Sequence, residues 1–113
     1  MTAIYNYYGE EKVTLEIANY SSNGNLAIQM FSCDENGYEE PFATLTVNLD
    51  IKLPEDCAFL DTNNLRDAIN FVLKYNLGKF TGISRTSGFC EYPLFQFNLK
   101  EVEKYANFQD ETR

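Results

Sequence analysis

Apolar and polar residues alternate along much of the first half of this chain. Between residues 12 and 19 the apolar side chains Val13, Leu15 and Ile17 alternate with polar ones. An alternation with a period of two predicts a strand that buries one face. A short aromatic segment, residues 3–8, precedes this strand across a glycine-containing turn. We therefore expect the two segments to pair as a hairpin.

Two Asn-Gly pairs mark the next turns. The first, at residues 23–24, separates the second strand from segment 26–33, which has Leu26, Ile28 and Met30 on one face. The second, at residues 36–37, leads into a fourth alternating segment over residues 42–49. Asn-Gly favours tight hairpin turns because both residues tolerate positive φ. The first 49 residues are thus predicted to form consecutive antiparallel strands.

One segment has the periodicity of a helix. It follows the polar run Asp-Thr-Asn-Asn at residues 61–64 and is followed by Gly78. Polar residues of this kind often begin a helix, and glycine often follows its end. We predict a helix over residues 64–76, with Leu65, Ile69 and Val72 facing the sheet.

Two further strands are predicted around a turn at residues 86–88. They cover residues 80–85 and 92–99, and Pro93 indicates a sheet edge or a bulge. Strands, then one helix, then strands, without a repeated βαβ unit, predict an α+β fold with a mostly antiparallel β-sheet and one main helix packed across it. We expect one domain over residues 1–108 and a frayed tail over residues 109–113.

The chain has eight Tyr and nine Phe among its 113 residues. A chain with this many aromatic residues can bury a small core without disulfide bonds. Tyr5, Tyr7 and Tyr8 are expected in the core or on the sheet surface, although tyrosine is also favoured at interfaces. Phe80 and Phe89 are expected in the core.

Negative charge is concentrated in one stretch of the chain. The formal net charge is −8, and seven carboxylates against the single Lys52 give residues 34–56 most of it. A surface of this kind repels nucleic acid and membrane phosphates and attracts basic protein surfaces. The alternative is that these charges lie on solvent-exposed loops and serve only to keep the protein soluble. The candidate partner-binding residues are Asp34, Glu35, Glu39, Glu40, Asp50, Glu55 and Asp56.

Catalytic and metal-binding chemistry has few residues to use. There is no histidine, which removes the commonest general base and the familiar catalytic triads. The three cysteines are odd in number and contain no Cys-x-x-Cys pair, so we expect reduced thiols rather than a disulfide framework or a zinc site. Carboxylates near residues 55–61 leave a small hydrolase as an alternative. We expect no enzyme activity, no cofactor and no metal.

The N-terminal residues lack the basic and apolar regions of a signal peptide. No stretch approaches the ~18 apolar residues of a membrane-spanning helix. We therefore expect a cytoplasmic protein that does not bind membranes.

Three segments resemble a family of unknown function. They are Pro-Phe-Ala-Thr-Leu-Thr-Val-Asn-Leu at residues 41–49, Cys-Ala-Phe-Leu-Asp-Thr-Asn-Asn at 57–64, and Ser-Gly-Phe-Cys-Glu-Tyr-Pro-Leu-Phe-Gln-Phe at 87–97. The resemblance covers residues 41–99 and is to short proteins from conjugative elements and prophages of Gram-positive bacteria. It implies a genetic setting in which small acidic proteins often inhibit restriction or CRISPR systems.

The sequence leads to one hypothesis and one alternative. The hypothesis is a non-enzymatic inhibitor, of anti-CRISPR or anti-restriction type, whose acidic residues compete for the DNA- or RNA-binding channel of a nuclease. Its partner would be a protein with a basic channel, and the inhibitor itself would not bind nucleic acid. The alternative is an accessory protein of a conjugative element that binds a partner or a small ligand.

Overall fold

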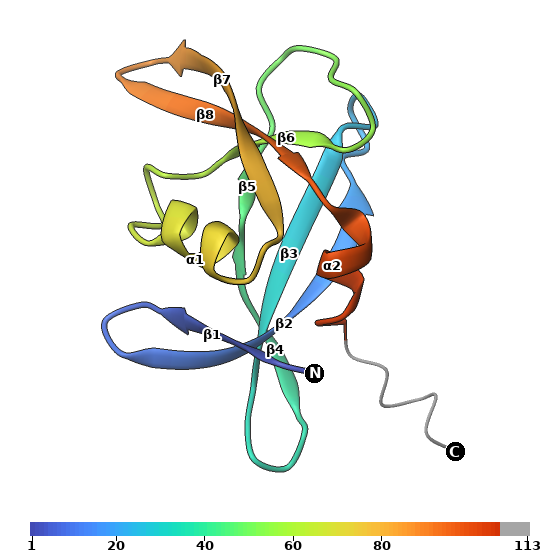
Figure 1. Ribbon diagram of the computed structural model, residues 1–113, viewed down its shortest axis with the longest axis vertical. Coiled ribbons are helices and arrows are strands. Elements are labelled where there is room, and N and C mark those ends of the chain that lie inside the picture. The colour runs from blue at the N-terminus through green and yellow to red at the C-terminus, as the bar shows by residue number, and fades with distance from the viewer. Residues whose placement is uncertain (107–113) are drawn as a thin grey trace.

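The computed structural model describes residues 1–106 (Figure 1). Strands predominate in these residues, and the two helices are short. The elements are β1 (Ala3–Asn6), β2 (Glu10–Asn19), β3 (Leu26–Cys33), β4 (Glu39–Thr44), β5 (Thr46–Val47), β6 (Cys57–Leu60), α1 (Ala68–Lys74), β7 (Gly78–Ser87), β8 (Cys90–Phe97) and α2 (Leu99–Glu103). The expected tail at residues 109–113 lies outside the described residues.

The first sheet has the order β1-β2-β3-β4, and every neighbouring pair is antiparallel. Both Asn-Gly turns join antiparallel neighbours, as the sequence predicts. Only their glycines adopt positive φ, +78° at Gly24 and +85° at Gly37, so neither is the tight two-residue turn that the Asn-Gly pairs indicate. A bulge in β4 leaves Phe42 without a register partner, between Pro41 and Ala43. The sheet curls so far that Phe42 contacts Tyr5 of β1, with ring centroids 6.0 Å apart.

The predicted fourth strand is in fact two strands in two different sheets. Leu45, which is fully buried, stands between β4 in the first sheet and β5 in the second. Its N–H donates to the Ile28 carbonyl at 2.8 Å, and its carbonyl accepts from the Asp61 N–H at 3.0 Å. Apolar and polar residues alternate without a break on both sides of Leu45. The sequence pattern therefore does not reveal that the chain crosses here from the first sheet to the second.

The second sheet has the order β5-β6-β8-β7 and is also antiparallel. Pro93 was expected at a sheet edge or a bulge; β8 is an inner strand, so the edge is wrong, and Pro93 pairs with Ser84 where the β7–β8 register shifts, with the extra residues in β7. The expectation that Phe80 and Phe89 belong to the core is wrong. Phe80 is half exposed and Phe89 is fully exposed, because both lie on a ribbon at the margin of the sheet.

The predicted helix is shorter than expected, and the side that it buries differs from the expected one. α1 begins only at Ala68, since residues 62–67 form turns. Leu65, Ala68, Phe71 and Val72 are buried. Ile69 was expected to face the sheet, but 39% of it is exposed. The sequence reasoning omitted Phe71, and its ring defines the buried side of the helix.

The main core lies between the two sheets and includes side chains from both helices. Among its largest buried side chains are Tyr5, Ile28, Leu60, Phe71 and Phe95. The architecture is therefore mostly antiparallel β-structure with two short helices packed on it. The expectation of one main helix is met only by the seven residues of α1.

A smaller apolar cluster lies beneath the loop between β5 and β6. Phe59, Tyr92 and Leu94 are buried there against apolar residues of that loop. The buried amide of Asn25 holds the loop in place, because it donates to the Ile51 carbonyl at 2.7 Å and accepts from the Leu53 N–H at 3.0 Å. This loop is thus an ordered part of the fold.

The helix phase gives a stability prediction. Phe71→Ala should lower the free energy of unfolding by about 3–5 kcal/mol, because it opens a cavity in the main core. Ile69→Ala should cost less, about 1–2 kcal/mol, because Ile69 is 39% exposed and buries less apolar surface than Phe71. Urea unfolding of both variants measures the difference. A larger loss for Ile69→Ala than for Phe71→Ala would mean that α1 buries the opposite side.

Candidate functional site

The seven candidate carboxylates do not form one surface. Four of them, Asp34, Glu35, Glu39 and Glu40, belong to the β3–β4 hairpin. The other three, Asp50, Glu55 and Asp56, belong to the loop between β5 and β6. Figure 1 shows the hairpin and this loop at opposite ends of the long axis. The crossing at Leu45 is the reason, because it carries the chain from one end of the molecule to the other.

Two carboxylates of the β3–β4 hairpin have structural roles. Asp34 accepts from the backbone N–H groups of Asn36 and Tyr38, each at 2.9 Å, and so fixes the turn. Glu39 accepts a hydrogen bond from the buried hydroxyl of Thr14, which ties this carboxylate to β2.

The other two carboxylates of the hairpin, Glu35 and Glu40, are exposed. Within residues 1–106 the single ion pair joins Lys104 to Glu101, so no described cation neutralises the hairpin. Tyr38, which is largely exposed, stands on the same hairpin. The hairpin therefore presents negative charge and an aromatic ring to solvent.

The loop between β5 and β6 uses its charges differently. The Asp56 carboxylate accepts from the Gln96 amide at 3.0 Å, and this hydrogen bond lowers the pKa of Asp56. Lys52 donates to the Asn23 carbonyl at 3.0 Å rather than to a carboxylate. Asp50 and Glu55 remain exposed. This end of the molecule thus exposes the carboxylates of Asp50 and Glu55, while the ammonium group of Lys52 is hydrogen-bonded to the backbone.

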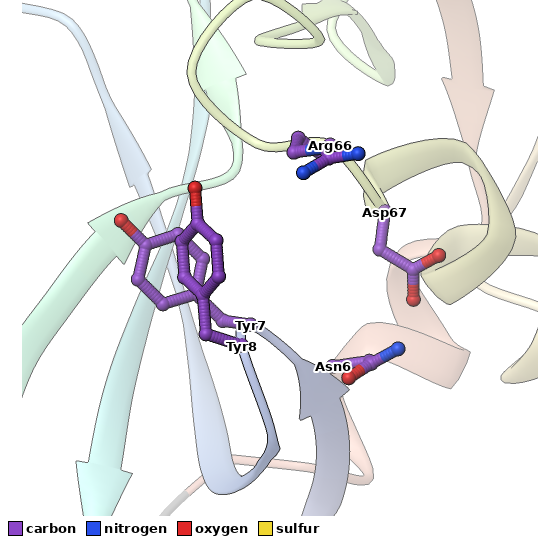
Figure 2. Close-up of a pocket in the computed structure, with 5 residues that line it drawn as sticks. All are labelled: Asn6, Tyr7, Tyr8, Arg66 and Asp67. Carbon is purple, nitrogen blue, oxygen red and sulfur yellow. The ribbon is translucent and has the colours of Figure 1, made fainter.

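A pocket of about 370 Å³ lies between the β1–β2 turn and the turn that precedes α1. Figure 2 shows Tyr7 and Tyr8 on one side of the opening and Arg66 and Asp67 on the other, with Asn6 below. The two tyrosine rings stand edge to face, with centroids 4.9 Å apart. Tyr7 and Tyr8 are exposed, whereas Tyr5 lies in the core. We call these five lining residues the tyrosine pocket.

Tyr8 has an unusual backbone conformation. Its φ is +55°, in the left-handed region, and it precedes Gly9, whose φ is +136°. A residue with a side chain pays about 1–2 kcal/mol to adopt this conformation. Residues held in this way gather at ligand-binding sites, so the strain is a pointer to function.

The tyrosine pocket offers a cation, a carboxylate, an amide and two aromatic faces. Arg66 makes no ion pair within residues 1–106, and Asp67 uses one carboxylate oxygen to accept from Asn70 at 3.0 Å. These groups can bind a ligand. Nucleophilic catalysis needs a nucleophile held against a base, and the pocket does not pair the two. The sequence singles out the tyrosines as possible interface residues but not Arg66 and Asp67, because these lie in a distant segment.

The described residues hold no cluster of three or more potential metal ligands. Cys33, Cys57 and Cys90 are free thiols. Burial, together with the neighbouring Asp56, raises the pKa of the Cys57 thiol, so it stays protonated at neutral pH. A protonated thiol is a poor nucleophile. None of the helices in this part of the chain has the length and apolar character to cross a membrane.

Residues 14–112, most of the chain, match a family described as a domain of unknown function, DUF4313. The chain belongs to the DUF4313 family. The expected resemblance to a family of unknown function is thereby confirmed, over a longer span than residues 41–99. No curated protein and no solved structure matches the chain. The DUF4313 match includes Arg66 and Asp67 and the β3–β4 hairpin, whereas Tyr7 and Tyr8 precede it.

The Tyr5 hydroxyl, beside the backbone of Asp67, gives a pH prediction. It is buried and makes no hydrogen bond of ordinary geometry with residues 1–106. Burial is the main reason that the pKa of Tyr5 is raised from 10.0 to about 12. In the unfolded chain Tyr5 ionises near pH 10, whereas in the folded protein it stays protonated up to about pH 12. Below pH 10 the hydroxyl is protonated in both states, so the stability of the fold is not reduced. Between there and pH 12 the domain should lose up to about 3 kcal/mol of stability through this group.

The matched variant is Tyr5→Phe, which should not show the loss of stability between pH 10 and pH 12. At pH 7 its stability should differ from that of the unmodified protein by less than about 1 kcal/mol. Urea unfolding of both proteins at pH 8 and pH 11.5 isolates Tyr5, because the other tyrosines are common to both. Equal pH dependence in the two proteins would show that the hydroxyl is not buried in the folded state.

Proposed function

We propose that this DUF4313 protein is a non-catalytic inhibitor that binds a nucleic-acid-handling nuclease of a CRISPR or restriction system. The carboxylates of the β3–β4 hairpin would occupy the basic channel that otherwise holds DNA or RNA. One observation carries the proposal: the hairpin presents four carboxylates at one end of the molecule, and no described cation pairs with them. The mobile-element setting implied by the sequence resemblance supports the same assignment.

The physical basis is competition for the same basic residues. Nuclease channels bind phosphates through Lys and Arg, and counterion release dominates that binding. Exposed carboxylates on a narrow hairpin can neutralise the same cations. Asp34 and Glu39 would act mainly by fixing the hairpin, since both accept hydrogen bonds within the first sheet. Glu35 and Glu40 would contact the partner.

The tyrosine pocket favours a second function, that of an accessory protein that binds a small ligand or a partner side chain. Aromatic faces beside one cation and one carboxylate are typical of recognition sites. The strained backbone of Tyr8 supports this alternative. The two functions can be separated by experiment, because no residue belongs to both the hairpin and the pocket.

The inhibitor function predicts an effect of charge position rather than of total charge. The double variant Glu35→Lys/Glu40→Lys should weaken inhibition at least about tenfold, since it places cations against a basic channel. The matched control is Asp50→Lys/Glu55→Lys, which has the same net charge but changes the opposite end of the molecule. It should alter inhibition by less than about threefold. DNA cleavage by a panel of guide-loaded RNA-guided nucleases and restriction endonucleases is the measurement.

Folding of both variants is checked by circular dichroism and thermal unfolding, which exposed charges should barely change. Inhibition by the unmodified protein should weaken as salt rises, because the attraction is between screened charges. The proposal fails if no nuclease of the panel is inhibited. It also fails if both double variants lose activity equally, which would indicate a general charge effect.

A further inference from the structure

β7 forms a long open edge of the second sheet. It pairs with β8 on one side, and no described strand pairs with its other side. Every residue of β7 after Gly78 is exposed. Figure 1 shows the β7–β8 ribbon projecting from the body of the molecule, away from the β3–β4 hairpin. The edge is therefore separate from the surface proposed to inhibit a nuclease, and a role for β7 is independent of that inhibition.

The other edges of the two sheets are short or interrupted. β1 has four residues, β5 has two, and β4 contains Pro41 and a bulge. Proteins limit unwanted pairing at sheet edges by such means. β7 has ten residues and no proline. Its own register shift, between Phe80 and Ser84, leaves a regular stretch from Ser84 to Ser87 beyond it.

The register shows which backbone groups of that stretch are free. Ser87 pairs with Cys90 across a two-residue turn that begins at Gly88, whose φ is +63°. The closing pair of such a turn exchanges both backbone hydrogen bonds. Alternation then points the N–H and C=O groups of Ser84 and Thr86 away from β8. Pro93, opposite Ser84, fits this pattern because it has no N–H to donate.

Apolar side chains at this margin remain uncovered. Phe80 packs on the buried ring of Phe95 at 5.8 Å but is half exposed, because the sheet ends there. Ile83 is also exposed, and Phe89 at the tip of the ribbon is fully exposed. A strand added beside β7 would cover Phe80 and complete the burial of that face. Exposed apolar groups in such a position mark interaction surfaces.

The charges of β7 indicate what would cover it. Lys79 and Arg85 pair with Gln96 and Tyr92, so both cations lie on the face opposite Phe80. β7 contains no acidic residue. We propose that β7 docks an extended segment of a partner protein in which apolar and acidic residues alternate. Backbone bonds would add the segment as a strand, its apolar side chains would cover Phe80, and its carboxylates would face Lys79 and Arg85.

The test uses a fluorescein-labelled octapeptide of alternating valine and glutamate, measured by fluorescence anisotropy. It should bind the unmodified protein, and Lys79→Glu/Arg85→Glu should weaken binding about tenfold or more. The matched control is Lys12→Glu/Lys100→Glu, which makes the same charge change at exposed positions elsewhere. It should change the affinity less than about threefold. A peptide methylated at its backbone nitrogens should not bind, since strand addition needs those donors.

Three results would each overturn the proposal. The first is failure of the valine–glutamate peptide to bind the folded, monomeric protein. The second is equal binding of a valine–lysine peptide, which would remove the charge argument. The third is a concentration-dependent dimer in analytical ultracentrifugation that Ser84→Pro dissociates, since a second copy would then cover the edge. Circular dichroism confirms that each variant is folded.

Discussion

The rest of the structure depends on the passage of the chain through Leu45. At this residue the chain leaves the first sheet and enters the second, with its N–H bonded to Ile28 and its carbonyl to Asp61. The buried Thr46 hydroxyl continues the link, because it accepts from the Ile28 N–H at 3.2 Å and lies 2.9 Å from the Tyr20 hydroxyl. Buried backbone groups must be paired, and here each sheet provides partners for the other. The two sheets thereby enclose one main core.

The same crossing explains the distribution of charge. A continuous hairpin would have placed the carboxylates of residues 34–56 side by side. Instead the chain runs the length of the molecule between them, so that four carboxylates stand on the β3–β4 hairpin and three lie in the loop between β5 and β6. Negative charge at two distant ends disfavours a single continuous mimic of nucleic acid. It leaves the hairpin as a compact charged element that can act alone.

Local patterns in the sequence were enough to predict the first three strands and the positions of the turns between them. Val13, Leu15 and the two Asn-Gly pairs determine the first three strands, because each signal lies within a few residues of the element that it forms. The crossing at Leu45 could not be predicted, since apolar and polar residues alternate on both sides of it. The phase of α1 was wrong for a related reason. Ile69 and Phe71 are both apolar, and tertiary packing decides which one is buried: the Phe71 ring lies 5.0 Å from that of Tyr5 in the main core.

The tyrosine pocket and the β7–β8 ribbon escaped prediction because their residues break the local rules. Apolar residues are normally read as core, yet Phe80 and Phe89 lie on an open ribbon. Tyrosine is normally read as a strand residue, yet Tyr8 occupies a left-handed conformation that suits glycine or asparagine. Folding alone gives no reason to keep either feature, since a polar residue at position 89 or an asparagine at position 8 would satisfy the backbone at least as well. Features that lower stability without aiding the fold are expected where a protein binds. The tyrosine pocket and the β7–β8 ribbon are therefore candidate binding surfaces, in addition to the acidic hairpin that we propose contacts a nuclease.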